Sequence, residues 1–317
     1  MRKFIVFAPP YNEMQGGVVC LHKLTDLLNR IGFEAYIFPS YENIIFNKSD
    51  FFLPSLRLAR EFVRHFRNFK TNINFISPIY DGPSESIQSD EWIVVYYEQV
   101  SGNPLKARNV VRWLLHQPGY HTGIINYGFN ELHIKFNEAI RDFNYPNSKL
   151  ADFLLPIIHY PLNYYNLNQI PERRSGSAYC IRKGKGKLIR HDLKDSVLID
   201  NLSHKKAAEV FKRVKTFISY DSYTAYSRFA ALCGCDSIVI PDENVSQEQW
   251  YPNPEDRYGV AYGFENINAA RETRILLQEK ILKEVEQSSK IAKVFAESSD
   301  SYFNGSRYNL FRKEHAQ

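Results

Sequence analysis

The first 38 residues contain the order of elements that most constrains the fold. Lys3–Ala8 is a short run of apolar, β-prone residues, and the glycine pair Gly16-Gly17 follows it after a polar loop. Apolar residues then recur at helical spacing over residues 18–31, and residues 33–38 predict a second strand. A strand, a glycine turn, a helix and a strand in this order predict the opening of a doubly wound parallel sheet.

Further strand-like runs continue the first half. We expect strands at residues 92–97, 110–115, 132–136 and 153–158, and a helix at residues 56–69. Residues 161–171 begin and end with proline and enclose a polar run, which is typical of a connection between domains. The sequence therefore predicts an N-terminal Rossmann-like domain over residues 1–170.

The second half repeats this pattern. Strands are expected at residues 178–182, 216–220 and 237–240, with helices at 205–214 and 223–232. Apolar spacing also predicts a long amphipathic helix over residues 268–295. The second Rossmann-like domain is thus predicted over residues 171–317, and we expect its last helix to pack back on the first domain.

Length and composition exclude several classes of protein. A chain of 317 residues that is 44% hydrophobic can bury a large core without disulfides or metals. The four cysteines match neither a zinc knuckle nor a disulfide framework, and no segment has the roughly 18 apolar residues of a membrane span. The N-terminal apolar run is too short for an export signal, so a cytoplasmic location is expected.

Positive charge is concentrated in one segment. Residues 173–194 hold eight lysines and arginines and one acid, a local charge of +7, whereas the whole chain carries +5. A nucleic-acid-binding protein would spread such charge over a face or an arm, so no nucleic acid partner is expected. One compact basic segment indicates a small phosphate-bearing ligand.

Three predicted turns follow strands, where helix N-termini and loops bind ligands in parallel sheets. The first is Gly16-Gly17, which would let the backbone approach a ligand or would simply be a tight turn. The second is residues 181–187, where arginine and lysine alternate with glycine, either to hold a diphosphate or as a solvated loop. The third is residues 219–224, which would bind phosphate and a sugar hydroxyl or would only cap a helix.

Two polar residues end apolar strands of the first half. His116 follows residues 113–115, and Glu98 follows residues 93–97. Each has the chemistry of a general base, although His116 is equally explained as a structural histidine and Glu98 as a partner of an arginine.

These segments resemble the GT-B glycosyltransferases of bacterial surface-polysaccharide (O-antigen or capsule) gene clusters. The resemblance follows the chain in order and is carried by residues 15–24, 97–105, 109–119, 181–184 and 220–235. It implies two Rossmann-like domains that face each other across a cleft, with the nucleotide-sugar donor held mainly by the second domain and the acceptor mainly by the first. It also implies a reaction without metal or other cofactor, because basic side chains and helix N-termini stabilise the leaving diphosphate.

The resemblance assigns residues to roles. The donor site would include the basic pair Arg182 with Lys183 or Lys187 and the glycine turn, and the sequence adds the hydroxyl-bearing turn. The full donor set is Gly16, Gly17, Arg182, Lys183, Lys187, Asp221, Ser222, Tyr223 and Thr224. Many retaining members carry two glutamates eight residues apart, and the corresponding residues here are Asp221 and Phe229, so nucleotide recognition is expected to differ.

The sequence thus predicts a glycosyltransferase that moves a sugar to a saccharide or lipid-linked acceptor. If the reaction inverts configuration, Glu98 or His116 is the base; if it retains configuration, the leaving phosphate takes the proton. Peripheral association with the inner membrane face or with other glycan-assembly enzymes is expected. The alternatives are a catalytically silent GT-B-like partner subunit and a nucleotide-sugar epimerase of the same fold.

Overall fold

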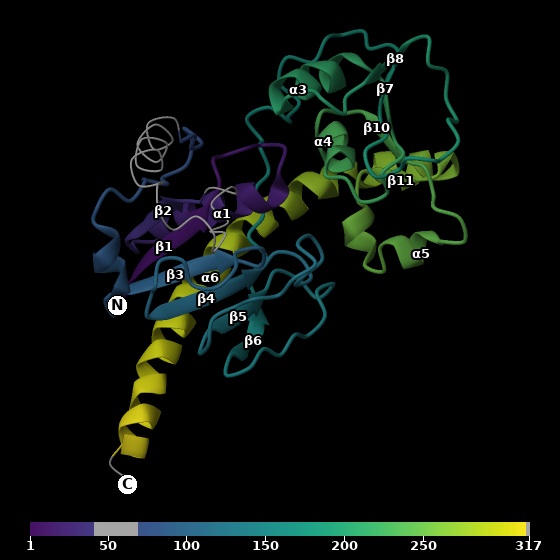
Figure 1. Cartoon of the computed structure of the whole chain (residues 1–317). Helices are drawn as coiled ribbons and strands as arrows, with labels where there is room; N and C mark the ends of the chain where they lie inside the picture. Colours follow the sequence, from purple (N-terminus) through teal and green to yellow (C-terminus); the bar gives the residue numbers. More distant parts are fainter. Residues whose placement is uncertain (41–68, 315–317) are drawn as a thin grey trace, which may run out of the picture. The chain divides into compact units, whose positions relative to one another are not determined.

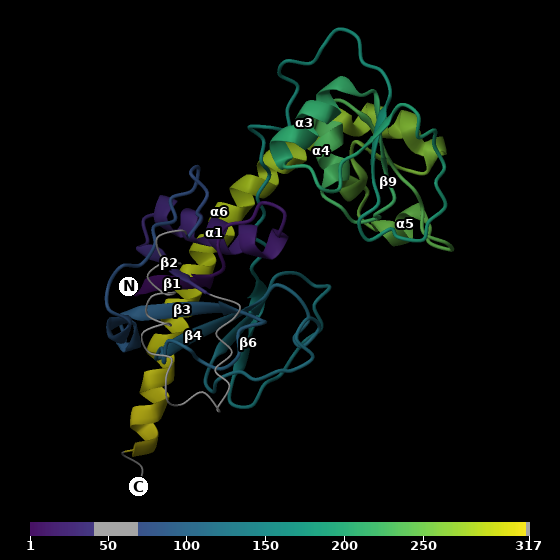
Figure 2. The same cartoon turned by 45° about the horizontal axis from the view of Figure 1, so that its top comes forward.

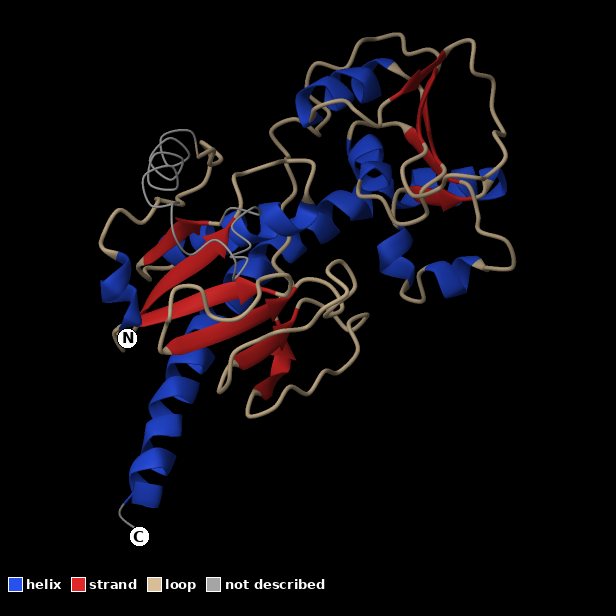
Figure 3. Cartoon of the chain, in the orientation of Figure 1, coloured by secondary structure: helices blue, strands red, loops and turns tan. Residues whose placement is uncertain are grey.

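The computed structural model describes residues 1–40 and 69–314, and the chain divides into two compact units (Figure 1). Unit 1 comprises Met1–His159 with Glu286–Gln317, and unit 2 comprises Tyr160–Val285. The division falls between residues 159 and 160, whereas the sequence placed a domain boundary near residue 170. Each unit contains its own parallel sheet with helices, which confirms the predicted α/β class (Figure 3).

Unit 1 is built on a six-stranded sheet in the order β2-β1-β3-β4-β5-β6, and all its strand pairs are parallel. Its elements are β1 (Lys3–Ala8), α1 (Gly16–Arg30), β2 (Ala35–Pro39), the 3-10 helix η1 (Ser84–Gln88), β3 (Trp92–Tyr97), β4 (Asn109–Leu114), β5 (Leu132–Lys135) and β6 (Lys149–Leu154). The strands β1 and β3 have the predicted bounds. The helix expected at residues 56–69 lies outside the described residues.

The two faces of this sheet have separate cores because side chains alternate along a strand. On one face, residues such as Phe4, Val95 and Trp113 pack with α1 and with the second half of α6 (Ile267–Glu314). The residues of α6 in this core are Ala292, Phe295, Ala296 and Phe303. Figures 1 and 2 both show this helix running along the unit 1 sheet.

Unit 2 has a five-stranded parallel sheet in the order β11-β10-β9-β7-β8. Its elements are β7 (Ser177–Cys180), β8 (Ser196–Leu198), α3 (His204–Arg213), β9 (Thr216–Ser219), α4 (Tyr226–Leu232), β10 (Asp236–Val239), α5 (Gln247–Trp250), η2 (Pro254–Arg257), β11 (Val260–Tyr262), η3 (Phe264–Asn266) and the first part of α6. A loop with no regular structure, drawn in tan in Figure 3, connects β7 to β8 and carries six of the eight basic residues of the segment 173–194.

Several predicted elements are wrong or missing. The strand expected at residues 153–158 is instead β6 at Lys149–Leu154, because Pro156 cannot donate to a sheet ladder. The prediction omitted β8, β11 and the short α5, and it ended the last helix 19 residues too early. The helix predicted from residue 223 begins only at Tyr226, for a reason described below.

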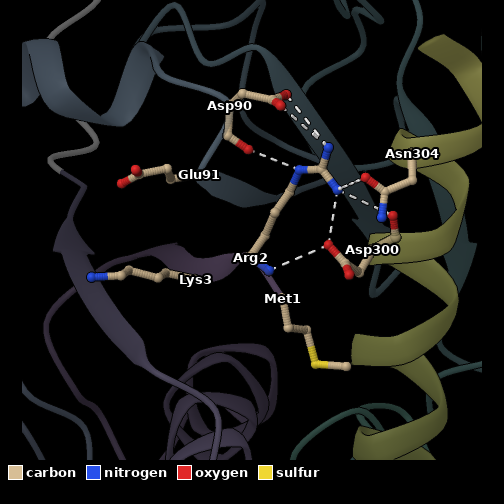
Figure 4. Close-up of a pocket in the computed structure, with 7 residues that line it drawn as sticks. All are labelled: Met1, Arg2, Lys3, Asp90, Glu91, Asp300 and Asn304. Carbon is tan, nitrogen blue, oxygen red and sulfur yellow. Dashed lines mark hydrogen bonds and ion pairs between the residues drawn. The ribbon is translucent and has the colours of Figure 1, made fainter.

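An ion-pair network lies at the amino ends of β1 and β3, where it lines an open cavity of about 530 Å³ (Figure 4). The Arg2 guanidinium lies 2.8 Å from Asp300 Oδ1 on α6 and 3.5 Å from Asp90 Oδ1, and it also donates to Asn304. Ligands of parallel sheets bind at the opposite, carboxyl ends of the strands. We therefore interpret this network as the contact that fixes α6 to the unit 1 sheet.

Among the residues that the structure describes, none of the helices combines the length and the apolar character needed to cross a membrane.

Candidate functional site

In unit 2, the basic loop and the hydroxyl-bearing turn meet at the carboxyl end of the sheet. Because β7 and β9 are parallel neighbours, the loop after Cys180 and the turn after Ser219 leave the same edge. They touch at Gly184, where an added Cβ would lie 2.0 Å from the Tyr220 carbonyl oxygen. The sequence separates these segments by about forty residues, and the fold brings them into direct contact.

Lys187 joins this contact to the end of β10. Its ammonium donates to Ser222 Oγ at 2.9 Å and to the Ile240 carbonyl at 2.8 Å, and it lies 2.7 Å from Asp242 Oδ1. Ser222 in turn donates to Asp242 Oδ2 at 2.6 Å. Burial alone would raise the pKa of Asp242, but the hydrogen bonds from Lys187 and Ser222 outweigh it and hold that pKa below its ordinary value. Lys187 therefore already has an anionic partner in the structure.

Arg182 is held by its backbone and leaves its guanidinium accessible. Its φ of 42° is in the left-handed region, and the amides of Ile181 and Arg182 both donate to the Asp200 carboxylate. The guanidinium lies 3.9 Å from Asp221 Oδ2 and over the Tyr226 ring, with a side chain still 30% exposed. A strained backbone that is fixed by a carboxylate is typical of a positioned binding residue. The next basic residue, Lys183, is exposed.

The turn at residues 221–224 is not the start of a helix, contrary to the prediction. The buried Asp221 accepts from the Tyr223 amide at 3.2 Å, and Thr224 Oγ1 accepts from the Tyr226 amide at 3.4 Å. These local side-chain bonds compete with helical hydrogen bonds, so α4 begins at Tyr226. The turn consequently offers the Ser222 hydroxyl and the 60% exposed Tyr223 ring rather than helical N–H groups.

Phe229, at the position where the resemblance expects an acid, belongs to the core of unit 2. Its ring is 4% exposed and stacks on Tyr165 at 4.3 Å between centroids. The neighbouring Arg228 pairs with Asp256 at 3.4 Å and with Glu284 at 3.7 Å. Neither Arg228 nor Phe229 is therefore directed to the loop that carries Arg182.

Unit 1 has a second cluster at the carboxyl end of its own sheet. The exposed Gly16 and Gly17 begin α1, and a Cβ on Gly17 would lie 3.4 Å from Leu115 Cδ1. Glu98, only 5% exposed, accepts from the Leu115 amide at 3.1 Å and from the Gln99 amide group at 3.2 Å. The fold thus brings the glycine turn, the end of β4 and a buried carboxylate together. Both of these donors to Glu98 are neutral groups.

His116 is half-buried beside this cluster, and its hydrogen bonding limits what it can do. Its Nδ1 accepts from the Gln117 amide at 2.8 Å. A neutral imidazole whose Nδ1 lone pair is used in this way carries its proton on Nε2. In this arrangement His116 can donate a hydrogen bond, but its Nδ1 lone pair is already used. It differs in this respect from Glu98, whose carboxylate keeps lone pairs that its two donors do not use.

Three residues of the unit 2 site were not predicted. Asp242 follows β10, and its position after a parallel strand was the available signal. Asp200 follows β8, so it was missed with that strand. Trp250 donates through its indole N–H to the Ser222 carbonyl at 2.7 Å, a contact between residues 28 positions apart that has no local sequence signal.

The fold and these clusters define a two-unit α/β protein with a cationic loop in one unit and a buried carboxylate in the other. No model of a known protein family matches the sequence, and no curated protein matches it. Solved structures to which the chain is similar include T4 phage β-glucosyltransferase, with 9% identity, a TM-score of 0.40 and coverage of 97% of this chain and 99% of that chain. Sucrose-phosphate synthase of Thermosynechococcus elongatus has 11% identity, a TM-score of 0.31 and coverage of 99% and 100%. MurG of Acinetobacter baumannii has 11% identity, a TM-score of 0.32 and coverage of 94% and 100%.

Proposed function

We propose that this chain is a glycosyltransferase that transfers a sugar from a nucleotide-diphosphate donor to the hydroxyl of a saccharide or lipid-linked acceptor. The observation that carries the proposal is the convergence of the basic loop with the Ser222 turn at the carboxyl end of the unit 2 sheet. The resemblance of the sequence to surface-polysaccharide enzymes supports a role in surface-glycan synthesis, with peripheral association at the inner membrane face.

Unit 2 would bind the donor. Arg182 supplies an accessible fork of N–H donors for diphosphate oxygens, and Lys183 adds a mobile cation. Lys187 would exchange its contact with Asp242 for one with phosphate, which would leave that carboxylate and the Ser222 hydroxyl to accept from sugar hydroxyls. Negative charge that develops on the leaving diphosphate is stabilised by these preorganised cations, and the proposal includes no metal.

Unit 1 would supply the base. Glu98 has lone pairs that its two neutral donors do not use, whereas the Nδ1 lone pair of His116 already accepts from the Gln117 amide. We therefore assign Glu98 as the base that takes the proton of the acceptor hydroxyl while this oxygen attacks the anomeric carbon and the bond from that carbon to the diphosphate breaks. This assignment implies inversion of configuration. His116 would donate a hydrogen bond to the acceptor.

A second candidate is a catalytically silent binding subunit, because Phe229 in the core leaves α4 without a carboxylate for a nucleotide ribose. An epimerase of the same fold would convert the donor without any acceptor. Release of nucleoside diphosphate that depends on the acceptor, measured in the presence of a chelator, distinguishes a transferase from both of these candidates.

Replacing Arg182 by alanine is expected to remove donor binding. A bound nucleotide sugar at a hundredfold excess over its dissociation constant stabilises the wild type by about 2.7 kcal/mol, seen as a raised melting temperature in a donor panel. The Arg182→Ala variant should lose most of this shift and transfer at least about a hundredfold more slowly, because a preorganised charge has been removed. The exposed Arg173 provides the matched control, since Arg173→Ala removes the same charge outside the site. Equal losses in both variants would contradict the assignment.

Replacing Glu98 by glutamine is expected to slow transfer by about a hundredfold or more, since the isosteric amide keeps the Leu115 contact but cannot accept a proton. Initial rates at saturating donor measure this effect, and donor-induced stabilisation should be unchanged. Glu138→Gln, at an exposed ion pair with Lys135 in the same unit, is the control. A Glu98→Gln enzyme with the wild-type rate would exclude Glu98 as the base.

A further inference from the structure

The loop that follows β4 presents a cluster of aromatic rings beside Glu98. The His116 ring lies 4.2 Å from that of Tyr120 and 4.8 Å from that of His121, and the latter two are 5.0 Å apart. Tyr120 is 70% exposed although it packs against two other rings. Exposed, contiguous aromatic surface of this kind commonly marks an interaction site.

The conformation of this loop is fixed by its own backbone. Gly119 has a φ of 77°, and its carbonyl accepts from the Gly123 amide at 2.8 Å, so the chain turns tightly under the rings. The Gln117 side chain accepts from the Arg141 amide at 2.9 Å. The backbone that carries the rings is therefore held in place before any ligand arrives, which lowers the entropic cost of binding.

The far end of the loop is tied to the segment that carries Glu98. The Tyr127 hydroxyl donates to the Glu98 carbonyl at 2.7 Å, and the Gly102 amide donates to the Asn126 carbonyl at 2.7 Å. The loop and the carboxylate thus belong to one hydrogen-bonded assembly within unit 1. A molecule that rests on the rings would lie next to this assembly.

The charge of the loop indicates what it can bind. Residues 116–130 contain no lysine, arginine, aspartate or glutamate, and their accessible polar groups are amides, the hydroxyls of Tyr120 and Thr122, and histidines. A polyanion or an anionic lipid surface would require cations here. The apolar C–H face of a pyranose fits the negative face of an aromatic ring, and its hydroxyls fit amides and imidazole N–H groups.

We propose that the exposed ring of Tyr120, supported by the His116 ring packed against it and by His121 at right angles to it, is an aromatic platform on which an uncharged sugar ring of the acceptor stacks. This inference rests on the proposed function and names the acceptor class: the ring that receives the new sugar is neutral. The platform holds that ring while Glu98 faces the attacking hydroxyl.

Direct binding of neutral oligosaccharides tests the platform without the donor. In saturation-transfer NMR with the full chain, cellotriose and maltotriose serve as probes, and at least one should receive saturation at the C–H protons of one ring. Tyr120→Ala should weaken this binding about three- to tenfold, whereas Tyr120→Phe keeps the ring and the affinity. Phe264→Ala, which removes a 42% exposed ring from unit 2, is the control and should bind as the wild type.

Three results would overturn the platform: equal binding by wild type and Tyr120→Ala, no saturation of either trisaccharide, or Tyr120-dependent sedimentation with phosphatidylcholine vesicles, which would make the loop a lipid contact. Melting curves verify that each variant is folded. Failure of the proposed function is distinguishable, because it appears as the absence of donor-induced stabilisation, which this experiment does not measure.

Discussion

Replacing Arg112 by alanine is expected to lower the free energy of unfolding by about 3–5 kcal/mol, since it leaves a buried carboxylate without its partner. Arg112 is fully buried on β4, donates to both oxygens of Glu131 at 2.7 and 2.9 Å, and also donates to the carbonyls of Val100 and Gly102. Its guanidinium lies 4.4 Å from the centre of the Tyr127 ring. Urea denaturation followed by fluorescence measures the loss.

The pH dependence of the stability lost in Arg112→Ala tests whether the loss comes from the charge of Glu131. Burial alone would raise the pKa of Glu131, but His133, whose Nε2 lies 3.4 Å from the carboxylate, and the hydrogen bonds from Arg112 hold it below its ordinary value. Ionised Glu131 therefore stabilises the fold above its ordinary pKa, and this contribution is lost as the pH falls through the folded-state value. The difference in the free energy of unfolding between wild type and Arg112→Ala should therefore become smaller in acid. The control is Arg108→Ala, at a side chain 62% exposed, with an expected change below about 1 kcal/mol. If the difference in the free energy of unfolding between wild type and Arg112→Ala does not change with pH, the charge of Glu131 is not the cause of the loss.

Replacing Gly184 by alanine is expected to abolish donor-induced stabilisation and to lower the free energy of unfolding by about 1–3 kcal/mol. The added Cβ would lie 2.0 Å from the Tyr220 oxygen and 2.3 Å from the carbonyl carbon, and neither backbone atom can move aside cheaply. The loop must then withdraw from the turn, which breaks the contact between Lys187 and Ser222.

Gly305→Ala is the control for this variant. Gly305 lies in α6 with nothing within 4 Å of an added Cβ, so alanine there should raise stability by about 0.5–1 kcal/mol. Melting curves of both variants with and without nucleotide sugar give the comparison. If the donor stabilised Gly184→Ala as much as it stabilises the wild type, contact between the basic loop and the Ser222 turn would not be needed for donor binding.

The sequence predicted the strands whose side chains are buried on both faces. Lys3–Ala8 and Trp92–Tyr97 are nearly continuous apolar runs, as central parallel strands require, and their bounds are correct. Two of the edge strands lack this signal. Ser196–Leu198 is only three residues long and partly exposed, and Lys149–Leu154 contains an exposed lysine and an exposed aspartate.

The segments of the candidate site could be named from sequence, but their contacts could not. The end of a parallel strand is visible in sequence, so Arg182, Ser222 and Glu98 were named as candidates, and their roles stay predictions. The pairing of Lys187 with Asp242 depends on β9 lying between β7 and β10 in the sheet, which no local pattern records. The helix at residue 223 was mispredicted because helical spacing does not reveal that Asp221 and Thr224 bond to the backbone instead.

The division of α6 between the units sets an order for folding during synthesis. Unit 2 is one continuous stretch, so its last residue, Val285, is made while unit 1 still lacks part of its interior. The missing pieces include Phe295 and Phe303, which are made after unit 2. The unit that begins first is therefore completed second, and until then the apolar face that α6 covers stays open.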